Sequence, residues 1–306
     1  MNKQRHYERI LVATDFSPGA DAALKQAVWL ARQTGAQIVL ANTVPDLSRS
    51  VFWASYEIER NQRELSQRSE STMRQLIADV QAVDLDVKFR TVIGEPFVGI
   101  THAVQAENYD LVLTGTRGLG KWEQFFVGST AKRLIRKCPS SVWIVKAEHV
   151  GPPKVVLAAT DFSDVSLKAV KEGLWVAQQS NAEFHLLHII DSKDVPEDLI
   201  SRIPKGSSLR QEIDNEASRR LEEFLDSLTV DRTKVQVHFS WGTPWQEIQR
   251  ISQHEAADLI AIGTVGRSGI QGMLLGNTAE KILDTCDCSI LTVKPDDFVS
   301  PIKPAS

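Results

Sequence analysis

The sequence carries the same pattern twice, and this internal repeat limits the chain to folds built from two similar halves. Residues 10–44 read ILVATDFSPGADAALKQAVWLARQTGAQIVLANTV, and residues 155–190 read VVLAATDFSDVSLKAVKEGLWVAQQSNAEFHLLHII. Aligning Asp15 with Asp161 sets an offset of 146 residues, and later segments align at 148. Because a unit of about 145 residues is far longer than one solenoid repeat, each half is expected to be a complete domain.

The domain boundaries follow from the repeat and from one proline-rich join. The 306 residues suffice for two domains that each bury a core of their own. The join is Gly151-Pro152-Pro153, where proline cannot continue a helix or a central strand. We therefore expect a first domain at residues 1–148, a linker at 149–154 and a second domain at 155–306.

Apolar strand segments alternate with helical segments within each half. Residues 8–14 form an apolar run, Ser17-Pro18 is a helix start, and Gly35 or its counterpart Asn181 suits the left-handed residue that ends a helix. The other elements expected in the first half are strands at 37–44, 86–93, 110–115 and 141–146, and helices around 57–82, from Glu95-Pro96 and from Gly128. Strands that are apolar throughout indicate a parallel sheet covered on both faces. Each half is thus predicted to be a five-stranded, doubly wound α/β domain, Rossmann-like in architecture.

Composition and charge exclude several classes of function. The formal net charge of -4 and the pI near 6.0 argue against a dedicated nucleic-acid binder, which normally shows clustered Lys and Arg. No apolar run approaches the ~20 residues that span a bilayer, and no apolar signal segment precedes the first strand. The three cysteines form no disulfide framework. We expect a cytoplasmic protein without a membrane span.

Metal binding and catalysis find little support in the sequence. Cys286 and Cys288 form a lone C-x-C without further ligands at suitable spacing. His185 and His188 are three apart on a predicted strand, which sends them to opposite faces, so they do not readily share a metal. No Ser-His-Asp set or carboxylate pair can be assembled from equivalent positions in the two halves. The chain is expected not to be an enzyme, with a slow ATPase activity left open.

The best candidate for a ligand site is the segment 115–130, GTRGLGKWEQFFVGST. In a doubly wound sheet, ligands bind beyond the carboxyl ends of the strands where the strand order reverses. Asp15 follows the first strand and Gly115 follows the fourth, so both face one crevice if those strands flank the reversal. Glycines let the backbone approach a ligand, and the helix that starts at Gly128 offers free N–H groups to an anion. Asp15 also has a possible structural role, as the cap of the helix that begins near Pro18, and the two roles are compatible.

Other phosphate-binding motifs do not match this segment. The P-loop pattern G-x-x-x-x-G-K-[ST] is absent from the sequence, and no G-x-G-x-x-G follows the first strand. The spacing that is present is Gly, two residues, Gly, nine residues, Gly and then Ser or Thr. Together with VATDFS on the first strand, this spacing resembles the ATP-binding branch of the universal stress protein family. Across both halves, the chain resembles a tandem, UspE-like member of that family.

The resemblance implies an adenine-nucleotide pocket in the first half. Asp15 would contact the ribose or adenine, and Val44 would lie against the base. The residues implied at the end of the fourth strand are Thr114 and Gly115, and those implied around the phosphates are Gly118, Gly128, Ser129 and Thr130, with Arg117 as a cation. The cofactor implied is ATP, with or without Mg²⁺.

The second half keeps part of this pattern and departs from the rest. Its candidate site consists of Asp161, Gly263, Gly266, Gly276, Asn277 and Thr278. Asn277 stands where the family's nucleotide binders have Ser or Thr, and Val265 replaces Arg117. We expect weaker nucleotide binding there or a different ligand. The alternatives are an interaction scaffold without nucleotide and a carrier of an apolar or lipid-like molecule, which the apolar segment IQGMLL would suit.

The resemblance also implies a quaternary arrangement and a role. In the family the last strand pairs two domains about a twofold axis, so residues 141–146 and 289–294 are expected to pair in an internal pseudo-dimer. A homodimer of whole chains stays open. The function implied is that of a stress-response protein, regulatory or protective, that binds an adenine nucleotide and protein partners of unknown identity.

Overall fold

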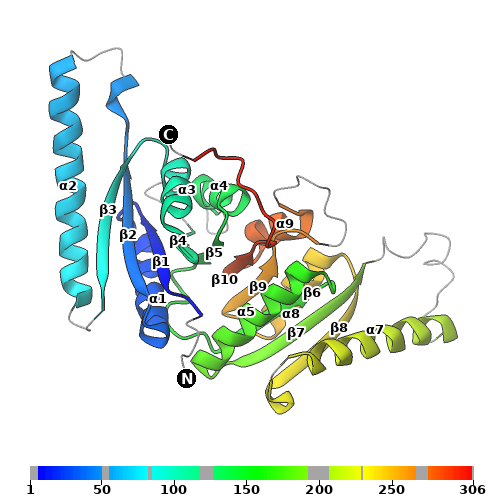
Figure 1. Cartoon of the computed structure of the whole chain (residues 1–306). Coiled ribbons are helices and arrows are strands. Elements are labelled where there is room, and N and C mark those ends of the chain that lie inside the picture. Colours follow the sequence, from blue (N-terminus) through cyan, green and yellow to red (C-terminus); the bar gives the residue numbers. More distant parts are fainter. Residues whose placement is uncertain are drawn as a thin grey trace. The chain divides into compact units, whose positions relative to one another are not determined.

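A computed structural model describes residues 6–49, 55–81, 85–116, 127–191, 207–228, 230–266 and 275–304. The chain forms two compact units (Figure 1). Unit 1 comprises Met1–Pro152 and Asp287–Ser306, and unit 2 comprises Pro153–Cys286. Among the described residues, no helix combines the length and the apolar character needed to cross a membrane.

Unit 1 contains alternating strands and helices followed by one strand from the end of the chain. Its elements are β1 (Arg9–Thr14), α1 (Pro18–Thr34), β2 (Gln37–Val44), the 3-10 helix η1 (Leu47–Arg49), α2 (Ser55–Gln81), β3 (Val87–Ile93), α3 (Pro96–Glu107), β4 (Leu111–Gly115), α4 (Ser129–Lys137), β5 (Ser141–Val145) and β10 (Ser289–Val293). The strands lie in the order β3-β2-β1-β4-β5-β10. The long helix α2 packs on β2 and β3 (Figure 1).

Unit 2 repeats this alternation with four parallel strands. Its elements are β6 (Val155–Thr160), α5 (Asp164–Ser180), β7 (Glu183–Asp191), α7 (Ser208–Asp226), the 3-10 helix η3 (Arg232–Lys234), β8 (Val235–Gly242), α8 (Pro244–His254), β9 (Leu259–Gly263) and α9 (Asn277–Thr285). The strands lie in the order β9-β6-β7-β8. Doubly wound α/β architecture is thereby confirmed for both halves.

The strand order reverses at the first strand of each half, as the sequence analysis required. Ala13 of β1 pairs with Ala41 of β2 on one side and with Thr114 of β4 on the other, and both pairings are parallel. Likewise, β6 lies between β7 and β9. Because β1 and β4 are neighbours and parallel, their carboxyl ends open at the same edge of the sheet.

The last strands of the two repeats pair with each other. β5 and β10 run antiparallel, with Trp143 opposite Leu291 and Val142 opposite Thr292. Trp143 and Leu291 are buried, and the Thr292 hydroxyl donates to the Val142 carbonyl at 3.0 Å. Pairing protects an apolar strand that would otherwise be an exposed edge. The expected pairing of these strands is confirmed, and it is the reason that the chain's last segment belongs to unit 1.

Candidate functional site

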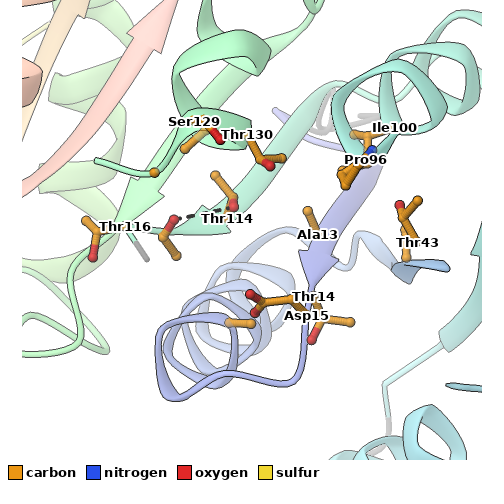
Figure 2. Close-up of a pocket in the computed structure, with 15 residues that line it drawn as sticks. Ala13, Thr14, Asp15, Thr43, Pro96, Ile100, Thr114, Thr116, Ser129 and Thr130 are labelled. Atoms are coloured by element: carbon orange, nitrogen blue, oxygen red, sulfur yellow. Dashed lines mark hydrogen bonds between the residues drawn. The ribbon is translucent and has the colours of Figure 1, made fainter. Parts of the chain in front are cut away.

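A pocket of about 290 Å³ opens at the carboxyl ends of β1 and β4 in unit 1 (Figure 2). It is lined by Ala13, Thr14, Asp15, Ala20, Ala41, Thr43, Pro96, Ile100, Thr114, Gly115, Thr116, Gly128, Ser129, Thr130 and Ala131. Asp15 lies at the end of β1, and Ser129 and Thr130 lie across the pocket at the start of α4 (Figure 2). The crevice joins four segments that are far apart in sequence.

Six of the residues implied for the first domain lie in the lining of this pocket. Those in the lining are Asp15, Thr114, Gly115, Gly128, Ser129 and Thr130. Val44 is buried at the end of β2, and its carbonyl accepts the Gly94 N–H at 2.9 Å. Arg117 and Gly118 lie outside the described residues.

The wall that sequence reasoning missed comes from β2 and α3. Ala41 and Thr43 line the pocket, and because side chains alternate along a strand, Val44 belongs to the opposite face. Strand alternation could therefore have predicted that Thr43 faces the pocket, but only if another pocket-facing residue of β2, such as Ala41, had been known. Pro96 and Ile100 belong to the first turns of α3, and no local motif marks them as pocket residues.

Asp15 organises the loop that leads into α1. Its Oδ1 accepts the Ser17 N–H at 3.1 Å, and Ser17 itself caps the helix by accepting the Ala20 N–H at 3.3 Å. Phe16 between them has a φ of 64°, an uncommon value for a bulky residue. The cap of α1 is thus Ser17, and Asp15 acts one step before it. The Asp15 side chain remains exposed and lines the pocket.

The start of α4 presents backbone donors to the pocket. Gly128 is the residue before the helix and provides no side-chain cap. Its own N–H donates to the Thr116 carbonyl at 2.7 Å, which holds the helix start beside the end of β4. The first turn of a helix leaves amide donors without intrahelical partners and carries the positive end of the helix dipole. With the Ser129 and Thr130 hydroxyls, this end of the pocket suits an anion.

Two glycines of the pocket have different physical reasons to be glycine. A Cβ at Gly115 would lie 2.4 Å from the Gly19 carbonyl carbon and 2.9 Å from the Ala20 nitrogen, so packing against α1 alone excludes a side chain. A Cβ at Gly128 would meet only the Thr116 oxygen, at 3.4 Å, and the φ of -60° is open to any residue. Nothing in the described residues requires a glycine at 128, and the missing side chain leaves the backbone open to close approach.

The second half keeps this frame. Asp161 Oδ1 accepts the Ser163 N–H at 3.1 Å, and Phe162 repeats the φ of 64°. A Cβ at Gly266 would lie 2.7 Å from Asp161 Oδ2, so the loop after β9 passes directly over this carboxylate. At Gly276 a Cβ would lie 3.4 Å from the Thr264 carbonyl oxygen and 3.8 Å from the Val265 Cα, both ordinary contact distances.

The remaining residues proposed for the second half lie at the start of α9. Asn277 and Thr278 are the first two residues of the helix. Gly263 is set by packing, because a Cβ there would lie 2.6 Å from a Val165 methyl group. The two halves thus share the backbone of the loop after the first strand and of the helix that begins after Gly128 or Gly276. They differ in the side chains around these segments.

One such difference lies between the second strand and its neighbours. In unit 1, the Asn42 amide donates to the Thr14 carbonyl at 2.7 Å, and its oxygen accepts the Ser69 hydroxyl at 2.7 Å. In unit 2, His188 takes the position of Asn42, and its Nδ1 donates to the Thr160 carbonyl at 2.8 Å. The His188 ring packs against Phe162, with ring centroids 4.3 Å apart. A polar network has become an aromatic cluster.

Comparisons with known proteins cover both halves. The model of the Universal stress protein family matches residues 6–146 and 153–294. Universal stress protein E of Photorhabdus laumondii subsp. laumondii is 27% identical over 317 residues, which cover 98% of this chain and 99% of the relative. The protein of the same name from Salmonella typhi is 29% identical over 311 residues, with 97% of each chain covered.

A solved structure agrees with the fold. The crystal structure of a universal stress protein from Archaeoglobus fulgidus DSM 4304 matches with a TM-score of 0.72 and 21% sequence identity, covering 94% of this chain and 99% of that chain. At this identity the similarity concerns the fold alone.

Proposed function

The chain belongs to the universal stress protein family as a tandem member, and from this premise we propose that its first domain binds ATP or a related adenine nucleotide. Family membership supports a role in the stress response. We further propose that the protein acts there as a regulatory or protective factor in the cytoplasm, with nucleotide occupancy changing how it meets protein partners. The first domain is taken as residues 1–148 and the second as 155–306, joined by residues 149–154.

One observation carries the proposal: Gly128 lines the pocket, and neither its backbone conformation nor packing among the described residues requires a glycine there. A phosphate group that contacts the backbone at the start of α4 supplies a reason for glycine, because helix N-termini bind phosphate through their free N–H groups. The ribose hydroxyls would then donate to the exposed Asp15 carboxylate. Ala13, Ala41 and Ile100 offer the apolar surface that an adenine needs.

The proposal includes both the free nucleotide and its Mg²⁺ complex. The Asp15 carboxylate and the Ser129 and Thr130 hydroxyls are oxygen groups, which Mg²⁺ prefers, and the ion usually binds through one or two carboxylates together with phosphates. These groups lie around the same pocket. Titrations with and without Mg²⁺ separate the two forms.

Calorimetry of the full chain with ATP, ADP and AMP tests the proposal. We expect Gly128→Ala to weaken nucleotide binding by about tenfold or more, since the methyl group separates the ligand from the backbone. Gly276→Ala is the matched control, because the second half has the same local geometry, and first-domain affinity should be retained. Ser129→Asn, which introduces the residue of the second half, should also weaken binding. Absence of binding heat at millimolar nucleotide would sink the proposal.

A second candidate function concerns the second domain. His188 and Phe239, with ring centroids 5.7 Å apart, stand where unit 1 has the polar Asn42 and Thr91. Phe162, the counterpart of Phe16, packs on the His188 ring. We propose an apolar or lipid-like ligand for the second domain as the alternative to a nucleotide, supported by this less polar end of β7. Native mass spectrometry of freshly isolated protein distinguishes the two, since a nucleotide adduct removed by Gly276→Ala would contradict the apolar ligand.

A further inference from the structure

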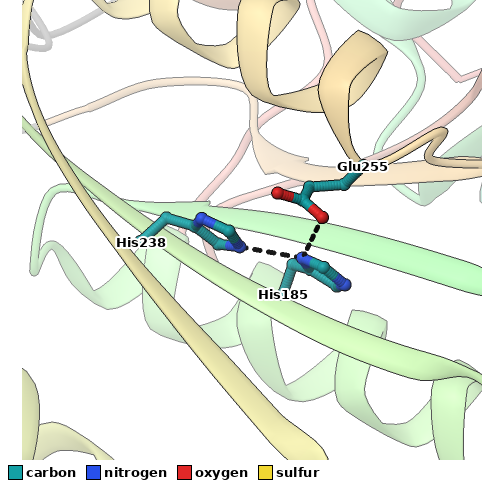
Figure 3. Close-up of side chains that lie close together, drawn as sticks. All are labelled: His185, His238 and Glu255. Carbon is teal, nitrogen blue, oxygen red and sulfur yellow. Dashed lines mark hydrogen bonds and ion pairs between the residues drawn. The ribbon is translucent and has the colours of Figure 1, made fainter.

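Two histidines and a glutamate of unit 2 lie together at a place away from the candidate ligand crevice (Figure 3). They are His185 on β7, His238 on β8 and Glu255 directly after α8. Their ligand atoms all lie within 4.8 Å of one another. His185 Nδ1 is 2.8 Å from His238 Nε2 and 3.8 Å from Glu255 Oε2. The two imidazole rings are stacked, at an interplanar angle of 9°.

Strand register and helix length bring these side chains together. Leu187 of β7 pairs with His238, so His238 is offset by two residues from His185 on the neighbouring strand. Side chains two residues apart along a strand point to the same face, and diagonal neighbours of this kind can touch. α8 ends at His254, which places Glu255 over the two rings (Figure 3). The sequence separation of His185 and His238 hid this cluster from motif analysis.

Unit 1 has an ion pair at the equivalent place. Both repeats pair their second and third strands in the same register, so Val39 corresponds to His185 and Arg90 to His238. Glu107, eleven residues after Pro96, corresponds to Glu255, eleven residues after Pro244. Arg90 Nη1 lies 2.7 Å from Glu107 Oε1, so a guanidinium cation neutralises this carboxylate in unit 1.

A second arginine reinforces the ion pair in unit 1 and is also missing from unit 2. Arg9 Nη2 bonds the other carboxylate oxygen of Glu107 at 2.5 Å. Val155 is the corresponding first residue of β6. On α8, Arg250 bonds Glu247 instead. Unit 2 thus keeps the carboxylate, replaces both arginines and adds a buried imidazole.

We propose that His185, His238 and Glu255 bind a divalent transition-metal ion, with zinc as the best match. Imidazole nitrogen and carboxylate oxygen are common zinc ligands, with bonds of about 2.0–2.2 Å. Tetrahedral bonds of that length place ligand atoms about 3.3 Å apart. The two separations from His185 Nδ1, 2.8 and 3.8 Å, bracket this value, and the His238 and Glu255 ligand atoms lie within 4.8 Å of each other. The metal ion takes the place of the Arg90 guanidinium.

The surroundings of His185 suit a metal ligand. The His185 side chain is 1% exposed, and its Nε2 has no hydrogen-bond partner among the described residues. Glu183 Oε2 lies 3.6 Å from this Nε2. Carboxylates near the outer nitrogen of a metal-bound histidine fix the tautomer that leaves the inner nitrogen free for the metal. Glu255 is held on its other oxygen by His254 Nδ1 at 2.8 Å.

The position of the cluster indicates a structural metal. His185 is the third residue of β7, whereas ligands of this fold bind beyond the opposite, carboxyl ends of the strands. A metal ion there would fasten the end of α8 to β7 and β8. This inference does not rest on the proposed nucleotide function.

The test uses the untagged full chain, stripped with a chelator and titrated with Zn²⁺ and with Co²⁺. We expect a single zinc ion to bind at micromolar or lower concentration and to raise the thermal unfolding midpoint. Co²⁺ should give the visible absorption of tetrahedral nitrogen and oxygen ligands, without the thiolate charge-transfer band that Cys138, Cys286 or Cys288 would produce.

His238→Arg is the decisive variant, because it restores the residue of unit 1 and lets Glu255 pair with a guanidinium. It should keep the chain folded while lowering zinc affinity by about 100-fold or more. Glu255→Gln should also weaken zinc binding. His188→Asn, which introduces the unit 1 residue outside the cluster, should leave zinc binding unchanged. Failure of the stripped chain to bind Zn²⁺, or equal affinity in wild type and His238→Arg, would overturn the proposal.

Discussion

At the scale of single residues, two glycines of the same sequence motif, Gly115 and Gly128, have different structural surroundings. Helix α1 occupies the space next to Gly115, whereas among the described residues a Cβ at Gly128 would meet only the Thr116 carbonyl oxygen, at 3.4 Å. From the sequence motif alone, both glycines are assigned to the ligand-binding site. The structure separates a glycine that packing requires from one that packing among the described residues does not require.

This separation predicts different effects on stability. Gly115→Ala forces a methyl group against the Gly19 and Ala20 backbone, and overpacking of this kind costs about 1–3 kcal/mol. Gly128→Ala should change the free energy of unfolding by less than about 1 kcal/mol, because alanine is a poorer N-cap of α4 than glycine but restricts the unfolded chain. Urea unfolding of both variants measures the difference. Equal destabilisation of the two would mean that Gly128 is also a packing residue.

A second residue-scale feature is the buried Lys294 in unit 1. Its side chain is 2% exposed, its Nζ donates to the Ile135 carbonyl and lies 4.1 Å from the centroid of the Phe298 ring. Burial lowers the pKa of Lys294 from 10.5 to about 7. The nearby Cys138 thiol has its pKa raised to about 11, also by burial.

Lys294 therefore predicts a pH dependence of stability. Between the folded pKa of about 7 and the unfolded value of 10.5, the unfolded chain binds more protons, so the free energy of unfolding rises with pH. The slope from Lys294 is at most about 1.4 kcal/mol per pH unit. Urea unfolding of wild type and Lys294→Met from about pH 7 to about pH 8, below the pKa of 9.0 of the Cys138 thiol in the unfolded chain, checks this. A wild-type slope no steeper than that of the variant would contradict it.

At the scale of elements, the first helix of each half begins and ends with similar capping residues. Ser17 and Ser163 cap α1 and α5 through the N–H three residues later. The other ends of these helices adopt the left-handed conformation, with φ of 71° at Gly35 and 54° at Asn181. Only glycine and, to a lesser degree, asparagine adopt this conformation readily.

The repeat therefore supplies its own control for a helix-end substitution. Gly35→Ala should lower the free energy of unfolding by about 1–2 kcal/mol, because a Cβ is strained in this conformation. Gly35→Asn, the residue of the second half, should cost less. Thermal unfolding midpoints of the two variants provide the measurement, and a loss for Asn as large as that for Ala would show that the φ at residue 35 is not the cause.

At the scale of the whole molecule, the compact units do not divide where the repeat does. β10 follows the entire second repeat in sequence, but it pairs with β5 and belongs to unit 1. A strand with an apolar edge is stabilised by whichever partner covers it. The chain end is thus a structural part of the unit that begins at the other terminus.

Hydrogen exchange can detect this assignment. Leu291→Ala removes a fully buried side chain, with an expected loss of about 2–5 kcal/mol. Faster exchange should appear in peptides of β5. Leu187→Ala, equally buried in β7, is the matched control and should accelerate exchange in β6 and β8 instead. Unchanged β5 exchange in Leu291→Ala would contradict the assignment of β10 to unit 1.

The sequence by itself determined the two-fold repeat, the doubly wound α/β class and the edge of the sheet at which Asp15 and Gly115 meet. These follow from local patterning, and carboxyl ends of neighbouring parallel strands necessarily share an edge. The tertiary structure alone decided which residues of β2 and α3 wall the pocket, and that His185 reaches His238 and Glu255. Those contacts depend on register and packing between segments far apart in the chain, which no local pattern encodes.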